Sequence, residues 1–371
     1  MAKNTAGFRF QDQTFALLFI VAIASLHAAA LVPLCRNNSH IDGEWAVRND
    51  TTKSFVCCGG KHRANGQNGM DVAGPFDFDM LPKNTCFESN TVSTFLEHGY
   101  LNYSAQCGDD CCSCDREGNT RFTPGQREKY EWIPASCHLQ PWNATLFCEV
   151  LGSRTILLVG DSTMQQTAST LMSMLAAGNT HGDAPCAPQI IYGRSDYLSF
   201  HAFNQRPFQS LNEEFHPDIA ILTAGARLKD EGDYWDIYGR LETYMNEKKQ
   251  QNATVPVMIW KSVNPPHLDC VSHTGGPIPG RDVYNRPGDP TDKYGHANVE
   301  ALDTFWRHTV ARGRTFFRLL DMRPLYQRPD AHVRGANNDC LHYCQPGALD
   351  IFSILLLQML LNGDIPQQSG G

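Results

Sequence analysis

Four short apolar runs recur through the second half of the chain. Each is bounded by polar or turn-forming residues, as expected of a parallel strand buried on both faces of a sheet. The runs occupy residues 154–160, 218–225, 255–262 and 315–322. Helical patterns follow at 163–177, 234–249, 298–312 and 348–361. Strands that alternate with helices predict an α/β fold in three layers, with a parallel sheet covered by helices on both faces.

The pattern is different before residue 151. Residues 35–150 are rich in Gly, Asn and Asp, contain few apolar runs and hold ten of the 14 cysteines. Such a composition predicts a loop-rich region held by disulfides rather than by a large core. The predicted organisation is therefore a Cys-rich region at 35–150 followed by an α/β domain at 151–371.

Residues 14–34 form an apolar segment of 21 residues without Asp, Glu, Lys or Arg. This length spans a bilayer core of about 30 Å at about 1.5 Å per residue. Lys3 and Arg9 precede the segment, which favours a cytosolic tail at 1–13 and a signal anchor. Three alanines at 28–30 leave the alternative of a cleaved signal peptide. Both interpretations send the rest of the chain into the secretory lumen, as a single-pass type II membrane protein or as a secreted one.

The cysteines and glycosylation sequons agree with a lumenal location. Fourteen cysteines is a high and even number, typical of an oxidising compartment. Asn-X-Ser/Thr sequons begin at Asn37, Asn49, Asn102, Asn143 and Asn252. The string CGDDCCSC at 107–114 has the residue types of a zinc site, but adjacent cysteines in a lumenal protein favour disulfides. We predict no metal site.

The charge of the chain excludes some partners. The formal net charge is −8, and no cluster of Lys and Arg suggests a groove that follows phosphates, so a nucleic-acid partner is not expected. A Gly-rich phosphate loop is also missing from the sequence. We therefore predict no bound nucleotide cofactor.

A Gly-Asp-Ser turn ends the first apolar run. Gly160 allows a tight turn, and Ser162 then lies at the N-terminus of the following helix, where backbone N–H groups stabilise developing negative charge. In a parallel sheet the carboxyl ends of the strands form the crevice where sites are built. The alternative is a plain helix cap, because Asp and Ser are favoured there. Asp161 is expected to cap the helix or brace the turn.

The second candidate element, Asp339 and His342, follows the last predicted strand and precedes the last helix. This position predicts the same edge of the sheet as Ser162. A carboxylate three residues before a histidine can orient the imidazole through one nitrogen, which leaves the other to act as a base for the serine. An ordinary loop histidine is the alternative.

Several longer strings accompany these two motifs. They are YEWIPASCHLQPWNATLF at 130–147, KSVNPPHLDC at 261–270 followed by Gly275-Gly276, RLLDMRPLYQRPDAH at 318–332 and DCLHYCQPG at 339–347. Together they resemble the SGNH/GDSL hydrolase superfamily and, within it, the trichome-birefringence-like and PC-esterase branch of polysaccharide O-acetyltransferases. The resemblance covers residue 130 to the C-terminus, and before it only GEW at 43–45 is similar to the family.

The resemblance implies an O-acetyltransferase with Ser162 as nucleophile, His342 as base and Asp339 as its orienting acid. The backbone N–H groups of Ser162 and Gly225 would hold the oxyanion. An acetyl donor such as acetyl-CoA is then a co-substrate, a glycan hydroxyl is the acceptor, and the Golgi membrane is the expected location. Two alternatives remain open: a carbohydrate acetylesterase of the same fold, and a glycan-binding protein that does no chemistry.

Other positions depart from the family pattern or have two interpretations. Gln165 stands where members commonly carry Arg, and residues 223–226 read Thr-Ala-Gly-Ala where plant members have Asn-Thr-Gly-His. Arg227 is then the nearest polar side chain to this block, so we expect Gln165 and Arg227 to contact substrate. His267 is expected to bind sugar or to brace its loop. Trp132 and Trp142 are expected to stack on sugar rings or, alternatively, to pack between the two regions.

Overall fold

The structure, a computed structural model, describes residues 32–36, 40–47, 100–102, 130–177, 186, 189–198, 206–267, 270, 272–273, 275–279, 296–332, 340–343 and 347–365. Asp339, the cysteines at 107–114, Asn37, Asn49 and residues 14–31 lie outside the described residues.

A six-stranded sheet organises these residues. Its strand order is β2-β5-β4-β6-β7-β8. The strands are β2 (Tyr100–Asn102), β5 (Ile190–Arg194), β4 (Ile156–Gly160), β6 (Ile219–Leu222), β7 (Val257–Lys261) and β8 (Arg318–Leu320). The last five are parallel, and β2 is antiparallel to β5. The four predicted strands are confirmed as β4, β6, β7 and β8, whereas β5 was not predicted because its apolar run is short.

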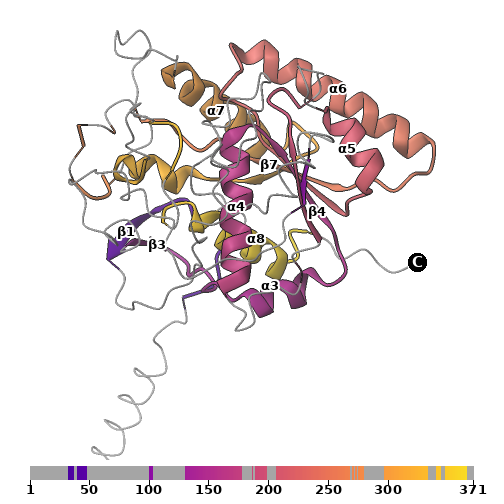
Figure 1. Cartoon of the computed structure of the whole chain (residues 1–371). Helices are drawn as coiled ribbons and strands as arrows, with labels where there is room; N and C mark the ends of the chain where they lie inside the picture. Colours follow the sequence, from indigo (N-terminus) through magenta and orange to yellow (C-terminus); the bar gives the residue numbers. More distant parts are fainter. Residues whose placement is uncertain are drawn as a thin grey trace, which may run out of the picture.

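Helices cover both faces of the sheet, as predicted (Figure 1). One face carries α3 (Ala144–Leu151), α4 (Ser162–Ala177) and α8 (Asp350–Leu361), and the other α5 (Phe208–Phe215), α6 (Glu231–Gln250) and α7 (His296–Ala311). Four of these are the predicted helices, and α3 and α5 are additional. In β4, Ile156 and Leu158 point to the first core and Leu157 and Val159 to the second. This double burial explains an apolar run without polar alternation.

A second, two-stranded sheet pairs β1 (Gly43–Val47) with β3 (Tyr130–Pro134). Trp45 and Trp132 face each other across it, with ring centroids 5.7 Å apart. Their indole N–H groups donate to the carbonyls of Pro324 and His40, respectively, at 2.8 and 2.6 Å. Trp142 donates to the carbonyl of Met174 in α4 at 3.1 Å. The geometry therefore agrees with the packing interpretation of Trp132 and Trp142.

Three disulfides tie the described residues together, which confirms the predicted disulfide bonding. They are Cys35–Cys137, Cys148–Cys186 and Cys270–Cys340. In the part of the chain that the structure describes, no group of His, Cys, Asp or Glu is arranged to hold a metal ion.

The two predicted regions share one core. Helix α3 crosses the predicted boundary, since it ends at Leu151. Trp132 and Phe147 pack in the same cluster as the residues of β4 and α8. The end of the predicted anchor also belongs to the folded part, because Leu34 pairs with His138 and Cys35 is buried in its disulfide. Within the described ranges no helix has the length and apolar character needed to cross a membrane.

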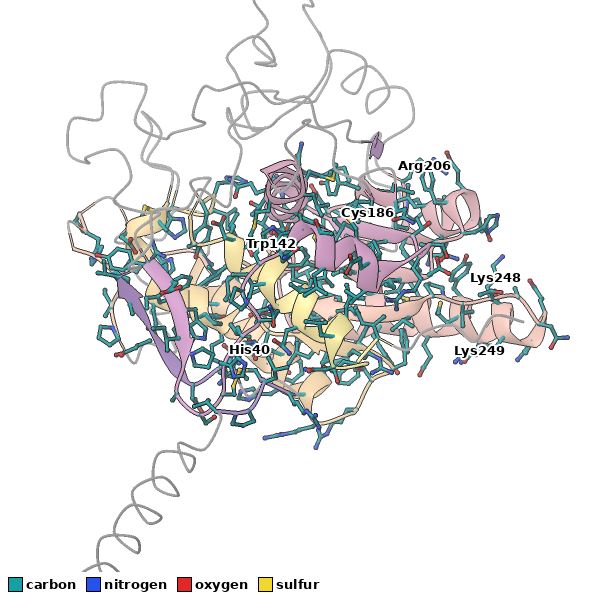
Figure 2. All side chains as sticks on the ribbon, turned by 90° about the horizontal axis from the view of Figure 1, so that it is seen from below. His40, Trp142, Cys186, Arg206, Lys248 and Lys249 are labelled. Atoms are coloured by element: carbon teal, nitrogen blue, oxygen red, sulfur yellow. A yellow bond between two sulfur atoms is a disulfide. The ribbon has the colours of Figure 1, made fainter. Side chains whose placement is uncertain are left out.

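A buried histidine, His40, connects the two-stranded sheet to the main sheet. Figure 2 shows Lys248 and Lys249 projecting near the end of α6, far from His40, which lies beside the two-stranded sheet. His40 is buried and bonds the carbonyl of Asp321 at 3.1 Å. Burial lowers the pKa of its imidazole. The two-stranded sheet is thus fastened to the end of β8.

Candidate active site at the end of the central strand

The site lies where the sheet changes its winding direction. From β4 the chain moves outward to β5 and then crosses back to β6 on the other side of β4. Ligands of open α/β sheets bind beyond the carboxyl ends of the strands at such a switch point. Ser162 is the first residue of α4 and is separated from the end of β4 by Asp161 alone, so it lies at this switch point.

The Gly-Asp-Ser turn is braced from several sides. Asp161 Oδ1 accepts hydrogen bonds from the backbone N–H of Thr163 at 2.9 Å and from its hydroxyl at 2.7 Å, so Asp161 caps α4. The hydroxyl of Tyr192 lies 3.2 Å from the carbonyl of Gly160 and 3.1 Å from that of Asp161. A Cβ at position 160 would lie 2.7 Å from Thr223 Cγ2 and 2.8 Å from Met164 Cβ, which leaves room for glycine only.

The structure brings Ser162 and His342 together. The Nε2 atom of His342 lies 2.8 Å from Ser162 Oγ, although 180 positions separate the two residues in the chain. A serine becomes a nucleophile when a base within hydrogen-bond reach removes its proton. Ser162 is 9% exposed and His342 is partly exposed, so the pair is not sealed inside the core. The distance between the two side chains meets this requirement for a candidate nucleophile and base.

A glutamine of α4 holds the backbone next to His342. Gln166 Nε2 donates to the carbonyl of Tyr343 at 2.8 Å, and the N–H of Tyr343 donates to Gln166 Oε1 at 3.0 Å. Gln166 is one helical turn after Ser162 and lies on the same face of α4. One face of the helix thus presents the serine to the His342 ring and the amide to the following peptide groups.

Two further contacts fix the same loop. The carbonyl of His342 lies 3.0 Å from the ring nitrogen Nδ1 of the buried His332. The carbonyl of Cys340 accepts a hydrogen bond from the backbone N–H of His267 at 3.0 Å. Cys340 is also bonded to Cys270. The loop that carries the candidate base is therefore anchored on both sides of His342.

A buried lysine braces the other side of α4. Lys261 Nζ donates to Asn264 Oδ1 at 2.8 Å, and Asn264 Nδ2 donates to the carbonyl of Thr163 at 3.2 Å. Burial lowers the pKa of Lys261 to about 8, against the opposing attraction of the Asp161 and Asp303 carboxylates. The end of β7 is thus linked to the first turn of α4 through a polar chain inside the protein.

The lysine predicts a pH dependence of stability. The folded pKa of Lys261 is about 8 and the ordinary value is 10.5, so between these pH values the unfolded chain binds a proton that the folded one has released. The difference in the free energy of unfolding between wild type and Lys261→Met is therefore expected to change with pH. It should rise by about 3 kcal/mol in favour of wild type from pH 8 to pH 10.5. Chemical denaturation at a series of pH values measures this difference.

The exposed Lys248 supplies the matched control. Its ammonium is paired with Glu213 at 2.8 Å on the surface, and its pKa is raised, mainly by that hydrogen bond. The difference between wild type and Lys248→Met should therefore not rise over the interval from pH 8 to 10.5. If the stability difference between wild type and Lys261→Met stays constant in that interval, Lys261 does not lose its proton in the folded protein.

The other predicted site residues are placed as follows. Gly225 follows β6 at the same edge of the sheet, where a Cβ would lie 2.3 Å from Val263 Cγ2. The half-exposed side chain of Arg227 lies 3.8 Å from Asp196 Oδ2. Gln165 is fully buried, and neither amide atom has a hydrogen-bond partner among the described residues. Arg227 is thus accessible, whereas Gln165 is enclosed in the protein.

His267 is fully buried rather than exposed at the crevice. Its Nε2 lies 3.0 Å from the carbonyl of Tyr326 and its Nδ1 lies 2.5 Å from Nε2 of His332. Of the two predicted roles, this position agrees with bracing of the loop.

Three of the five predicted sequons, at Asn102, Asn143 and Asn252, lie among the described residues. Asn143 is exposed and caps α3, and its side-chain oxygen accepts from the N–H of Leu146 at 2.9 Å. Asn252 is exposed after α6 and has a φ of 54°. Asn102 is the last residue of β2. The exposed amides of Asn143 and Asn252 leave room for a surface glycan.

Three residues of the site were not predicted from the sequence. Gln166, Lys261 and His332 each act through contacts with a different segment of the chain. The i, i+4 spacing of Ser162 and Gln166 is the one local pattern that could have indicated a role for Gln166. His332 lies inside one of the strings that carries the family resemblance.

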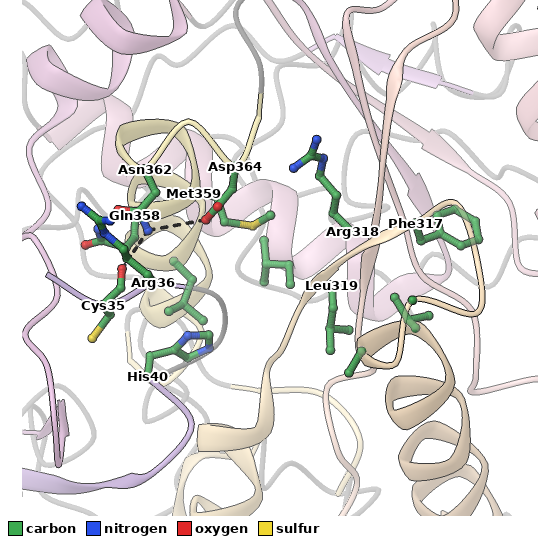
Figure 3. Close-up of a pocket in the computed structure, with 15 residues that line it drawn as sticks. Cys35, Arg36, His40, Phe317, Arg318, Leu319, Gln358, Met359, Asn362 and Asp364 are labelled. Atoms are coloured by element: carbon green, nitrogen blue, oxygen red, sulfur yellow. Dashed lines mark hydrogen bonds between the residues drawn. The ribbon is translucent and has the colours of Figure 1, made fainter.

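A pocket of about 350 Å³ lies elsewhere, beside β8 (Figure 3). It is lined by the N-terminal segment with Arg36 and His40, by Arg318 of β8 and by the end of α8. There Asn362 Nδ2 donates to the carbonyl of Cys35 at 2.7 Å. Ser162 and His342 do not line this pocket.

Compared with known proteins, the chain matches no family model and no curated protein sequence.

Proposed function

We propose that this protein is an O-acetyltransferase of the SGNH/GDSL type that moves an acetyl group to a glycan hydroxyl. The contact of 2.8 Å between His342 Nε2 and Ser162 Oγ at the switch point of the sheet carries the proposal. The resemblance of the flanking strings to polysaccharide O-acetyltransferases supports the choice of reaction. Residence in the Golgi membrane through residues 14–34 is part of the same proposal.

In the first step, Ser162 Oγ attacks the carbonyl carbon of the acetyl donor while His342 Nε2 takes the hydroxyl proton. The N–H groups of Ser162 and Gly225 would stabilise the oxyanion, the first of them at the N-terminus of α4. When the intermediate collapses, the bond to the donor group breaks and that group receives the proton from His342. The product is an acetyl ester on Ser162.

In the second step, a sugar hydroxyl replaces the donor. Its oxygen attacks the acetyl carbonyl carbon while its proton passes to His342 Nε2. The bond to Ser162 Oγ then breaks, and the serine recovers its proton from His342. Asp339 would keep the imidazole oriented through its other nitrogen in both steps. No metal or bound cofactor is needed for this sequence of proton transfers.

The experiment that tests this function is intact-protein mass spectrometry on the full chain in detergent. The protein is incubated with an activated acetyl ester, with and without a panel of oligosaccharides, beside a Ser162→Ala variant. We expect one acetyl group mapped to Ser162, absent in Ser162→Ala, that is discharged faster onto a sugar than onto water.

Other outcomes select the alternatives. Discharge at one rate regardless of sugar would make the protein an acetylesterase. Failure to acetylate Ser162 in a protein whose circular dichroism is that of a folded α/β chain would contradict both enzymatic functions and favour a glycan-binding role.

A further inference from the structure

Two buried histidines face each other behind the loop that carries His342. Nδ1 of His267 lies 2.5 Å from Nε2 of His332, and both side chains are fully buried. The rings come from segments 65 positions apart in the sequence, the loop after β7 and the end of η6 (Pro329–Ala331). A short contact between two imidazole nitrogens in a dry environment requires a proton between them.

The outer nitrogens of the pair determine the number of protons. His267 Nε2 lies 3.0 Å from the carbonyl of Tyr326, and His332 Nδ1 lies 3.0 Å from the carbonyl of His342. A carbonyl oxygen only accepts hydrogen bonds, so each outer nitrogen carries a hydrogen. A neutral imidazole has one N–H, which the outer nitrogen already uses. With both rings neutral, two lone pairs would therefore face each other at 2.5 Å and repel.

The neighbouring tyrosine does not supply the missing proton. The hydroxyl of Tyr343 lies 2.7 Å from the carbonyl of Pro265 and 3.5 Å from His267 Nδ1. Its single hydrogen is taken by the shorter bond to the carbonyl. The proton between the rings must belong to the histidine pair.

We propose that His267 and His332 share one additional proton, and that the resulting buried cation is a positioning element for His342. The positioning role rests on the proposed function, whereas the shared proton does not. The proton lets His332 donate to the carbonyl of His342 while its other nitrogen stays bonded to His267. The backbone of His342 is thereby connected to the buried η5 segment (Arg323–Gln327) through two rings.

Charged groups near the pair come from two segments, η6 with its N-cap and α7. Arg328, the N-cap of η6, and Asp330 within η6 bond each other at 2.8 and 2.9 Å. On α7, Asp303 accepts from the N–H of Val263 at 2.8 Å and from the hydroxyl of Tyr326 at 3.1 Å.

Glu300, also on α7, is the carboxylate that balances the shared proton in this proposal. Its side chain is buried. Burial raises the pKa values of Tyr326 and Tyr343 well above the ordinary value, and the charge of Glu300 contributes to both shifts. The ring of Tyr343 lies 4.2 Å from that of His332, so the proposal assigns the balancing charge to the carboxylate that acts on this tyrosine.

A rise in pH removes the shared proton and breaks one of the hydrogen bonds that hold the loop of His342. One ring must then turn and give up the carbonyl of Tyr326 or that of His342. Because the unfolded histidines release their protons near pH 6.5, the stabilisation is complete below about that pH and is lost above it, where the folded pair deprotonates. Once the folded pair has begun to lose its proton, acetylation of Ser162 should accordingly fall about tenfold per further pH unit.

Two variants remove the shared proton and keep the carbonyl bonds. In His267→Gln the amide Nε2 can donate to the carbonyl of Tyr326, and in His332→Asn the amide Nδ2 can donate to that of His342. His216→Asn is the matched control. His216 ends α5 away from the pair with a φ of 45°, a conformation that Asn tolerates.

The first readout counts protons. Nitrogen NMR of the full chain, labelled with ¹⁵N-histidine in detergent, is expected to show three N–H protons on the four ring nitrogens of the pair near neutral pH. In each variant the remaining histidine should show a single N–H, as should both rings of the wild type if the proposal is wrong. This readout is independent of any acetyl transfer.

The second readout is the pH profile of Ser162 acetylation. Wild type and His216→Asn are expected to share an alkaline fall that His267→Gln and His332→Asn lack, with acetylation retained near neutral pH. Identical profiles in all four proteins would overturn the positioning role. Failure of every protein to acetylate would count against the proposed function, and the proton count would still decide whether the pair is charged.

Discussion

Replacing His342 by alanine is expected to slow the acetylation of Ser162 by at least about 10³-fold. The His342 side chain supplies the base at 2.8 Å from the serine hydroxyl, and removing one member of such a unit costs on the order of 10³- to 10⁶-fold. The fold should survive, because His332 and Gln166 hold the backbone at positions 342 and 343 rather than the imidazole. Acetyl incorporation per unit time on the full chain measures the effect.

The control for this variant removes an imidazole outside the site. His273 Nε2 is bonded to the carbonyl of Gly276 at 2.8 Å in a loop, so His273→Ala should acetylate at the wild-type rate. Free imidazole added to His342→Ala should restore part of the lost rate, since it can fill the vacated space and act as base. A His342→Ala protein that acetylates within about tenfold of wild type would show that His342 is not the base.

Gln166→Leu is expected to have the second largest effect, on both stability and rate. It leaves the buried N–H and carbonyl of Tyr343 without partners, at about 1 to 3 kcal/mol each in the free energy of unfolding. The same change frees the peptide groups next to His342. A displacement of the base by about 1 Å costs on the order of 10²-fold in rate. Urea denaturation and the acetylation rate of Ser162 measure the two effects.

Gln165→Leu is the matched control for the stability measurement. Gln165 is equally buried and precedes Gln166 on α4, but its amide has no hydrogen-bond partner among the described residues. Exchanging an unpaired buried amide for an apolar side chain of similar size should leave the free energy of unfolding unchanged or raise it. Equal losses of stability in the two variants would mean that volume, and not the bonds to Tyr343, explains the cost.

These predictions share one physical picture, in which α4 organises the site. Its N-terminus carries Ser162, and one turn later Gln166 holds the loop of the base. From the other side, Asn264 donates to the carbonyl of Thr163 and is itself held by Lys261. The serine and the base are thus positioned by buried polar bonds rather than by exposed ion pairs, which are worth little in solution.

Much of the architecture follows from local sequence patterns. The apolar runs that became β4, β6, β7 and β8 are buried on both faces, and the helices between them follow a 3.6-residue period. β5 was not predicted because only three apolar residues precede Gly193 and Arg194. Its strand conformation is fixed by backbone pairing with β4 and β2, which its own sequence pattern does not indicate.

Local sequence patterns also indicated the two candidate residues of the site. Ser162 after a strand and His342 before the last helix were assigned to one edge of the sheet, because parallel strands place their carboxyl ends together. The contacts that hold these two residues in place are visible only in the folded chain. Gln166 meets Tyr343 across 177 positions and His267 meets His332 across 65. Such contacts depend on strand order and on the packing of loops, and no short-range periodicity encodes them.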